Sequence, residues 1–136
     1  MVSDAHLDTQ WNWDIQTTIK DYVWNTISQN LFLLKQYPEY IFNFEGAVKY
    51  AWMKEYYPAQ YEEMKKFIES GRWHISGASW DATDTLVPSI ESAIRNIMLG
   101  QDYYRKEFGV ESTDIFLARL FRFLAGHFLP LRPIAD

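Results

Sequence analysis

Three side chains near the start of the chain could bind a metal ion. Asp4, His6 and Asp8 alternate with Ala5 and Leu7. In an extended strand successive side chains point to opposite faces, so at this spacing the three polar side chains share one face. Zn²⁺ takes histidine nitrogen and carboxylate oxygen as ligands, and the pattern therefore predicts a candidate divalent-metal site. The alternative is that both acids are solvated loop residues and that His6 packs beneath a helix.

A second segment has side chains suited to a sugar. Trp80 is followed by Asp81 and Asp84, which places an indole beside two carboxylates. Sugars stack their C–H faces on indole rings and donate hydroxyl hydrogen bonds to carboxylates. Trp11, close behind the candidate metal site, offers a second flat apolar wall. The alternative for residues 80–84 is an acidic loop with one buried tryptophan.

Other polar residues have ordinary structural explanations. Glu91 fits the first turn of a helix, where a negative charge complements the helix dipole. Glu45 and His74 stand near expected strands, and on their own we expect them to be structural. The sequence contains no G-x-G-x-x-G, P-loop or G-x-S-x-G motif, so nucleotide binding and hydrolysis by an elbow serine have no support.

Composition indicates one globular domain. The 136 residues are 48% hydrophobic, 18% aromatic and 23% charged, with a net charge of −5. No run of Lys and Arg suggests a nucleic-acid partner, and no apolar stretch approaches the roughly 18 residues of a membrane span. No signal peptide is visible. The absence of cysteine excludes disulfides and leaves the compartment open, with the cytoplasm favoured.

The elements that must position these side chains alternate between strand and helix. Apolar spacing, proline breaks and capping residues predict helices over residues 14–36, 47–57, 58–71 and 90–108. Short branched and aromatic runs predict strands over residues 40–44, 73–76 and 113–117, and the chain is expected to begin inside an earlier strand. The alternation predicts an α/β fold with parallel strands and helices. Ligands in such folds bind beyond the carboxyl ends of the strands, where residues 4–11 and the loop 77–88 are expected.

Several segments resemble glycoside hydrolase family 38, the α-mannosidases. The string D-A-H-L-D-T-Q-W at residues 4–11 is similar to that family's signature H-x-H-x-D-x-x-W at the end of its first barrel strand. The motifs F-E-G, G-R-W, G-A-S-W and D-I-F-L follow in the family's order. The resemblance covers residues 2–117, and the number and colinearity of the motifs make it specific.

This resemblance implies a zinc-dependent retaining exo-α-mannosidase that hydrolyses terminal α-mannosyl residues of oligosaccharides. It implies a partial (β/α)₇-type barrel for this chain, with Zn²⁺ as the cofactor and a possible homo-oligomer of the full-length protein. Carried over by position, His6 and Asp8 are metal ligands, Trp11 packs on the bound sugar and Asp84 lies near the substrate.

Two departures from the family pattern affect activity. Asp4 stands where the signature has its first histidine. After Leu117 the family continues L-P-D-x-F-G-F, where the Asp is the nucleophile and a zinc ligand, whereas this chain has Ala118 and Arg119. With the nucleophile lost, the isolated chain is expected to be inactive. The alternative function is a non-catalytic carbohydrate-binding or interaction fragment.

The last residues are expected to be a frameshifted tail. One choice of codons for residues 118–123, read one nucleotide later, encodes Pro-Asp-Cys-Phe-Gly, which is the missing motif. A choice of codons for residues 125–136, read two nucleotides later, also gives a family-like string. We therefore divide the chain into residues 1–117, an N-terminal part of an α-mannosidase-like catalytic domain, and the tail 118–136.

Overall fold

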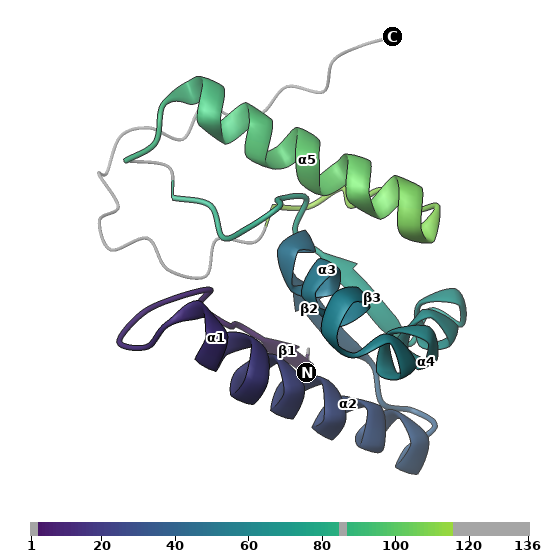
Figure 1. Cartoon of the computed structure of the whole chain (residues 1–136). Coiled ribbons are helices and arrows are strands. Elements are labelled where there is room, and N and C mark those ends of the chain that lie inside the picture. Colours follow the sequence, from purple (N-terminus) through teal and green to yellow (C-terminus); the bar gives the residue numbers. More distant parts are fainter. Residues whose placement is uncertain (1–2, 85–86, 116–136) are drawn as a thin grey trace, which may run out of the picture.

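A three-stranded parallel sheet organises the protein (Figure 1). The structure, a computed structural model, describes residues 3–84 and 87–115. The strands are β1 (Ser3–Ala5), β2 (Phe42–Glu45) and β3 (Trp73–Ser76), and they pair in the order β1-β2-β3. The predicted α/β class with parallel strands is confirmed. Closure of such a sheet into a barrel stays a prediction.

The two faces of the sheet differ in character because side chains alternate along each strand. One face carries large apolar side chains that belong to the buried core: Phe42, Phe44, Trp73 and Ile75. The opposite face carries Asp4, Asn43 and His74, which are paired in register across the three strands. Asp4 and His74 are exposed on this polar face, so the described core lies on one side of the sheet only.

One long helical segment follows β1. Residues 15–36 form α1 (Ile15–Thr17), a π-helical stretch η1 (Thr18–Val23) and α2 (Trp24–Gln36). Asp14 caps its start by accepting a hydrogen bond from the backbone N–H of Thr17. The predicted helix over residues 14–36 is confirmed. Its π-helical stretch was not predicted.

The remaining helices also lie close to their predicted positions. They are α3 (Ala47–Tyr56), α4 (Pro58–Glu69) and α5 (Ile90–Phe108). Pro58 at the first position of α4 separates α3 from α4. Ser89 caps α5, and Gly109 ends it in the left-handed conformation. No described helix has the length and apolar character that a membrane crossing would need.

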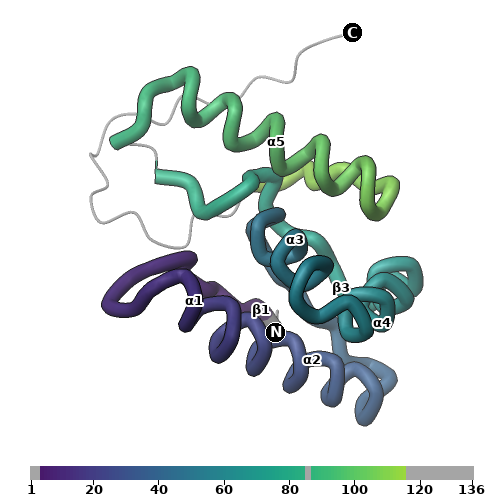
Figure 2. Tube along the Cα trace, viewed as in Figure 1, coloured from purple at the N-terminus to yellow at the C-terminus, as the bar shows by residue number. Residues whose placement is uncertain are grey.

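Helix α5 lies directly against the loop that follows β3 (Figure 2). A Cβ atom on Gly100 would stand 2.2 Å from the carbonyl oxygen of Ala78 and 2.4 Å from the carbonyl carbon of Ser79. The helix backbone and the loop backbone therefore touch with no side chain between them. The backbone of Trp80 adds a hydrogen bond, donating its N–H to the carbonyl of Asn96 at 2.8 Å.

The predicted strand over residues 113–117 is not found in its described part. Residues 113–115 have no strand assignment, and residues 116–117 lie outside the described residues. The segment still runs beside the chain that leaves β3, because the carbonyl of Asp114 accepts a hydrogen bond from the N–H of Ala78 at 3.0 Å. That bond is made after β3 has ended, so it starts no ladder in the described residues.

Candidate functional site

The carboxyl ends of the strands bring His6 and Glu45 together. Ala5 is paired with Phe44, so His6 follows directly after β1 at the level of the last residue of β2. Nδ1 of His6 lies 2.8 Å from Oε1 of Glu45. On the other side of the ring, Nε2 of His6 lies 3.2 Å from Oδ1 of Asp8. The predicted proximity of His6 and Asp8 is therefore observed, with Glu45 as a partner that the sequence did not indicate.

The imidazole of His6 thus stands between two carboxylates. Carboxylate oxygens only accept hydrogen bonds, and a neutral imidazole has a single N–H to donate. If Glu45 receives that proton through Nδ1, the contact between Nε2 and Asp8 needs either a second ring proton or a cation between the two atoms. Two ligand atoms of a tetrahedral zinc stand roughly 3.4 Å apart, close to the separation seen here. His6 and Asp8 therefore fit two positions of such a metal.

The described residues do not complete a metal site. Within residues 3–84 and 87–115 there is no group of three or more His, Cys, Asp or Glu side chains that could hold a metal ion. The predicted convergence of Asp4, His6 and Asp8 into a three-ligand site is therefore not found. The reason is local: β1 ends at Ala5, so the alternation of a strand does not extend as far as Asp8.

Glu45 is buried, with an exposed fraction of 4%. Burial raises the pKa of its carboxyl, and this effect is opposed first by the nearby charge of Lys49 and then by the hydrogen bond with His6. At Asp4 desolvation likewise raises the pKa of the carboxyl, and this effect is opposed first by a hydrogen bond with the backbone of Ala5 and then by His6 and Lys49. Both carboxyls thus lie near the positive charge of Lys49.

Lys49 supplies that charge from the first turn of α3. Its side chain is fully buried, and its Nζ has no hydrogen-bond partner among the described residues. The nearest carboxylate recorded is Asp81, with 3.9 Å between Nζ and Oδ1. Nζ also lies over Gly46, where a Cβ would come within 2.8 Å of it, and Gly46 itself has a φ of 84°. A lysine in an otherwise apolar run, Ala-Val-Lys-Tyr, is the signal that could have identified this residue.

Asp81 connects the segment after β1 to the loop after β3. Its Oδ1 accepts a hydrogen bond from the hydroxyl of Thr9 at 2.6 Å and another from the N–H of Ala82 at 2.8 Å. The carbonyl of Thr9 in turn accepts a hydrogen bond from the hydroxyl of Thr18 at 2.7 Å. The two polar segments indicated by the sequence therefore contact each other directly.

The predicted sugar-contacting residues occupy different surroundings. Trp11 has an exposed fraction of 52%, which leaves ring surface available to a ligand. Trp80 is half-buried and packs edge-on against Tyr103, with the ring centroids 5.8 Å apart. Trp80 is thus less buried than the alternative of a buried tryptophan expects, and part of its surface remains exposed.

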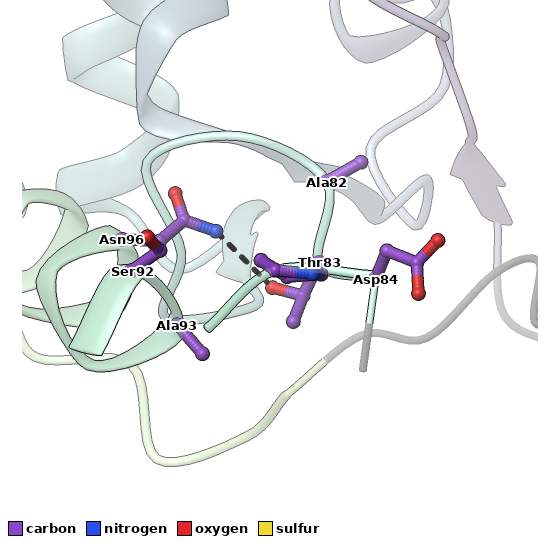
Figure 3. Close-up of a pocket in the computed structure, with 7 residues that line it drawn as sticks. Ala82, Thr83, Asp84, Ser92, Ala93 and Asn96 are labelled. Carbon is purple, nitrogen blue, oxygen red and sulfur yellow. Dashed lines mark hydrogen bonds between the residues drawn. The ribbon is translucent and has the colours of Figure 1, made fainter. Parts of the chain in front are cut away.

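Asp84 borders a pocket of about 280 Å³ at the end of the loop (Figure 3). Thr83 and Asn96 line the same pocket, and Nδ2 of Asn96 donates to the hydroxyl of Thr83 at 3.4 Å. Figure 3 shows the carboxylate of Asp84 directed away from that pair. Glu91 lies in the first turn of α5, as expected, and it also forms an exposed ion pair with Arg95.

Comparison with known proteins gives the family. Residues 1–121 match the family model for the glycosyl hydrolases family 38 N-terminal domain. Alpha-mannosidase G of Dictyostelium discoideum is 34% identical over 124 residues, and alpha-mannosidase 2C1 of Homo sapiens is 30% identical over 123 residues. These matches cover 91% and 89% of this chain but only 11% and 12% of the two relatives.

Among solved structures, the fold is similar to that of 4-alpha-glucanotransferase from Thermococcus litoralis. The TM-score is 0.63 at 18% sequence identity, and the match covers 85% of this chain and 18% of the other. At that identity the similarity concerns the fold alone. The family follows from the sequence matches: the chain belongs to glycosyl hydrolase family 38, and its residues 1–121 correspond to the N-terminal domain of that family.

Proposed function

We propose that this chain is the metal- and sugar-binding N-terminal part of a zinc-dependent retaining exo-α-mannosidase. The substrate would be an oligosaccharide with a terminal α-mannosyl residue. Relatives that carry the name alpha-mannosidase support the substrate class. The observation that carries the proposal is the position of His6, whose two ring nitrogens face the carboxylates of Glu45 and Asp8.

In this proposal Nε2 of His6 and Oδ1 of Asp8 hold the zinc ion. Zinc would supply a fixed positive charge that orients the vicinal hydroxyls of the sugar. Glu45 accepts the Nδ1 proton of His6, which sets the ring orientation and leaves the Nε2 lone pair available to the metal. The burial of Glu45 keeps water from competing for that hydrogen bond.

Two residues would contact the sugar itself. The exposed ring of Trp11 offers a flat face for the C–H groups of a mannose. The carboxylate of Asp84 would accept hydroxyl hydrogen bonds at the far side of the site. Trp11 and Asp84 belong to the two segments that the hydrogen bond between Thr9 and Asp81 joins.

We further propose that the isolated chain does not turn over substrate. A retaining glycosidase needs one carboxylate as nucleophile and a second as acid and base. The family pattern puts the nucleophile where this sequence has Ala118 and Arg119, which lie outside the described residues. Restoring the reading frame after residue 117, with the chain that follows it, is expected to restore turnover that depends on His6, Asp8 and Trp11.

The test combines zinc binding with turnover of an aryl α-mannoside in added zinc. The chain is expected to bind zinc and to give no turnover above background. His6→Ala should lose zinc, whereas His74→Ala, which changes an exposed histidine in β3, should not. Full zinc binding by both His6→Ala and Asp8→Ala would contradict the assigned ligands. Mannoside binding without zinc would favour the alternative of a non-catalytic carbohydrate-binding fragment.

A further inference from the structure

The carboxylate of Asp81 accepts hydrogen bonds from both candidate ligand segments. Oδ1 of Asp81 accepts a hydrogen bond at 2.6 Å from the hydroxyl of Thr9, which belongs to the segment with His6, Asp8 and Trp11. The same oxygen accepts a hydrogen bond at 2.8 Å from the N–H of Ala82, in the loop that leads to Asp84. A short hydrogen bond to an ionised acceptor is about twice as strong as one between neutral groups, so this oxygen is a firm junction.

The loop side of the junction is held independently of Asp81's carboxylate. The amide of Asn96 bonds twice to the backbone of Asp81, accepting from its N–H at 3.0 Å and donating to its carbonyl at 3.0 Å. The N–H groups of Ala47 and Val48, at the start of α3, donate to the carbonyls of Ser79 and Trp80. The loop is therefore held against α3 and α5 by these bonds. The carboxylate of Asp81 is not needed for that attachment and instead binds Thr9.

The other side of the junction has fewer attachments. Thr9 lies between Asp8 and Trp11, four residues beyond the end of β1. Its carbonyl is held by Thr18, and its hydroxyl is held by Asp81. Removing the Asp81 carboxylate would therefore release a large share of what positions this segment against the loop.

Lys49 supplies a positive charge close to the carboxylate of Asp81. Its buried ammonium lies 3.9 Å from Oδ1 of Asp81, and a fully buried cation without a hydrogen-bond partner is unfavourable unless negative charge stands nearby. The charge of Lys49 thus helps to hold the Asp81 carboxylate in its observed position.

We propose that Asp81 is a positioning residue that sets the distance between the candidate metal ligands and the candidate sugar-contacting loop. This inference rests on the proposed function, and it concerns a residue to which that function assigns no role. Asp81 touches neither metal nor sugar in this proposal. It acts through Thr9, whose segment carries His6, Asp8 and Trp11.

The experiment uses the full chain and three variants. Asp81→Ala removes the acceptor, Thr9→Val removes the donor, and Asp81→Asn keeps an acceptor oxygen without the charge. Affinity for Zn²⁺ is measured by competition with a chelator, and affinity for methyl α-mannoside by calorimetry in saturating zinc. A urea-unfolding cycle on Thr9→Val and Asp81→Ala measures their coupling without any ligand.

The chain contains a matched control at the other end of α3. Glu107 accepts hydrogen bonds from Tyr61 at 3.0 Å and from Lys54 at 2.7 Å, so it forms a hydroxyl–carboxylate–ammonium group of the same composition. Glu107→Ala should lower stability in the way that Asp81→Ala does. It should leave zinc and mannoside affinity unchanged, because no candidate ligand segment is attached to it.

The expected result is a specific pattern of losses. Asp81→Ala and Thr9→Val should each weaken mannoside binding about tenfold, and their combination should weaken it no further. Asp81→Asn, which keeps an acceptor oxygen but loses the charge, should weaken binding less than Asp81→Ala does. The unfolding cycle should show coupling between Thr9 and Asp81. Unchanged mannoside affinity in Asp81→Ala, with normal binding by the unaltered chain, would overturn the inference. If the unaltered chain binds neither zinc nor mannoside, the proposed function fails, and the unfolding cycle then decides: additive effects of Thr9→Val and Asp81→Ala overturn the inference as well.

Discussion

The side chains of His6 and Glu45 meet across 39 residues of sequence, with 2.8 Å between Nδ1 and Oε1. The contact exists because β1 and β2 are parallel neighbours whose ends stand at the same level. It gives the imidazole one fixed orientation before any ligand arrives. A residue next to a predicted metal ligand thus becomes the group that orients it.

Removing the charge of Glu45 should weaken zinc binding without removing a ligand. Glu45→Gln cannot accept the Nδ1 proton as strongly, and loss of such an outer partner typically lowers metal affinity about 10- to 100-fold. Chelator competition measures the change. Glu91→Gln, which alters an exposed acid paired with Arg95, is the control and should leave the affinity unchanged.

Trp11→Ala should separate sugar binding from metal binding. The ring is 52% exposed and supplies no ligand atom to a metal, so zinc stoichiometry should not change. Mannoside affinity should fall by roughly tenfold, since loss of an aromatic contact typically removes about 1 kcal/mol or more. Parallel calorimetric titrations with zinc and with methyl α-mannoside check this, and equal losses in both would argue against the assignment.

Gly100→Ala should destabilise the fold by about 3 kcal/mol, although alanine is the better helix former. The added methyl would meet backbone atoms of Ala78 and Ser79, which cannot move aside as a flexible side chain could. Gly109→Ala is the comparison, because its Cβ meets nothing within 4 Å and only the positive φ of 66° opposes it. Its loss should be about 1 kcal/mol. Urea unfolding measures both, and a smaller loss at Gly100 than at Gly109 would contradict the packing described.

Acid should remove the stabilising contribution of Glu107. Hydrogen bonds from Lys54 hold the pKa of Glu107 below its ordinary value of 4.5. A carboxyl with a lowered pKa in the folded state stabilises the fold above its unfolded pKa, and this contribution is lost as the pH falls through the folded pKa. Glu107→Gln should therefore lose less stability than the unaltered chain when the pH is lowered from neutral to below 4.5. Melting temperatures across that range provide the measurement, and identical acid sensitivity of the two proteins would refute it.

The isolated chain should associate in solution. In the described residues β1 and β3 each leave one edge without a strand partner, and exposed edges are templates for pairing between chains. Large apolar side chains also stand exposed along and just before α5: Val87, Ile90, Ile94 and Met98. Light scattering across a concentration series should show mass above that of a monomer. A monodisperse monomer with a sharp cooperative melt would be the contrary result.

Local patterns were enough to predict the helices and the strands β2 and β3. Apolar spacing, Pro58 and the caps Ser89 and Gly109 are all signals within a few residues of the boundaries that they set. The π-helical stretch over residues 18–23 was missed because no short-range rule for it operates in the sequence. The expected strand over residues 113–117 has the right composition, but in its described part it lacks a neighbour aligned for a ladder.

The site shows the same division between local and distant causes. His6 and Asp8 are two residues apart, and their side chains lie close together as predicted, although β1 ends before either residue. Glu45 acquires its role from the register of β1 on β2, which no single segment encodes. Lys49 was overlooked because lysines are usually solvated, and its burial depends on Gly46 leaving room for Nζ. Zinc itself stays a prediction.

The contact at Gly100 also limits how the sequence can vary. Where two backbones touch, no side chain is present to grow, shrink or rotate in compensation for a neighbour's change. Substitutions on the exposed side of α5 would therefore be tolerated, whereas substitutions of Gly100 would not. A library of all single substitutions in residues 90–108 should show one intolerant glycine in a helix whose outer face accepts most replacements. The loop that carries Asp81 and Asp84 would then keep its position against α5 while other residues of that helix change.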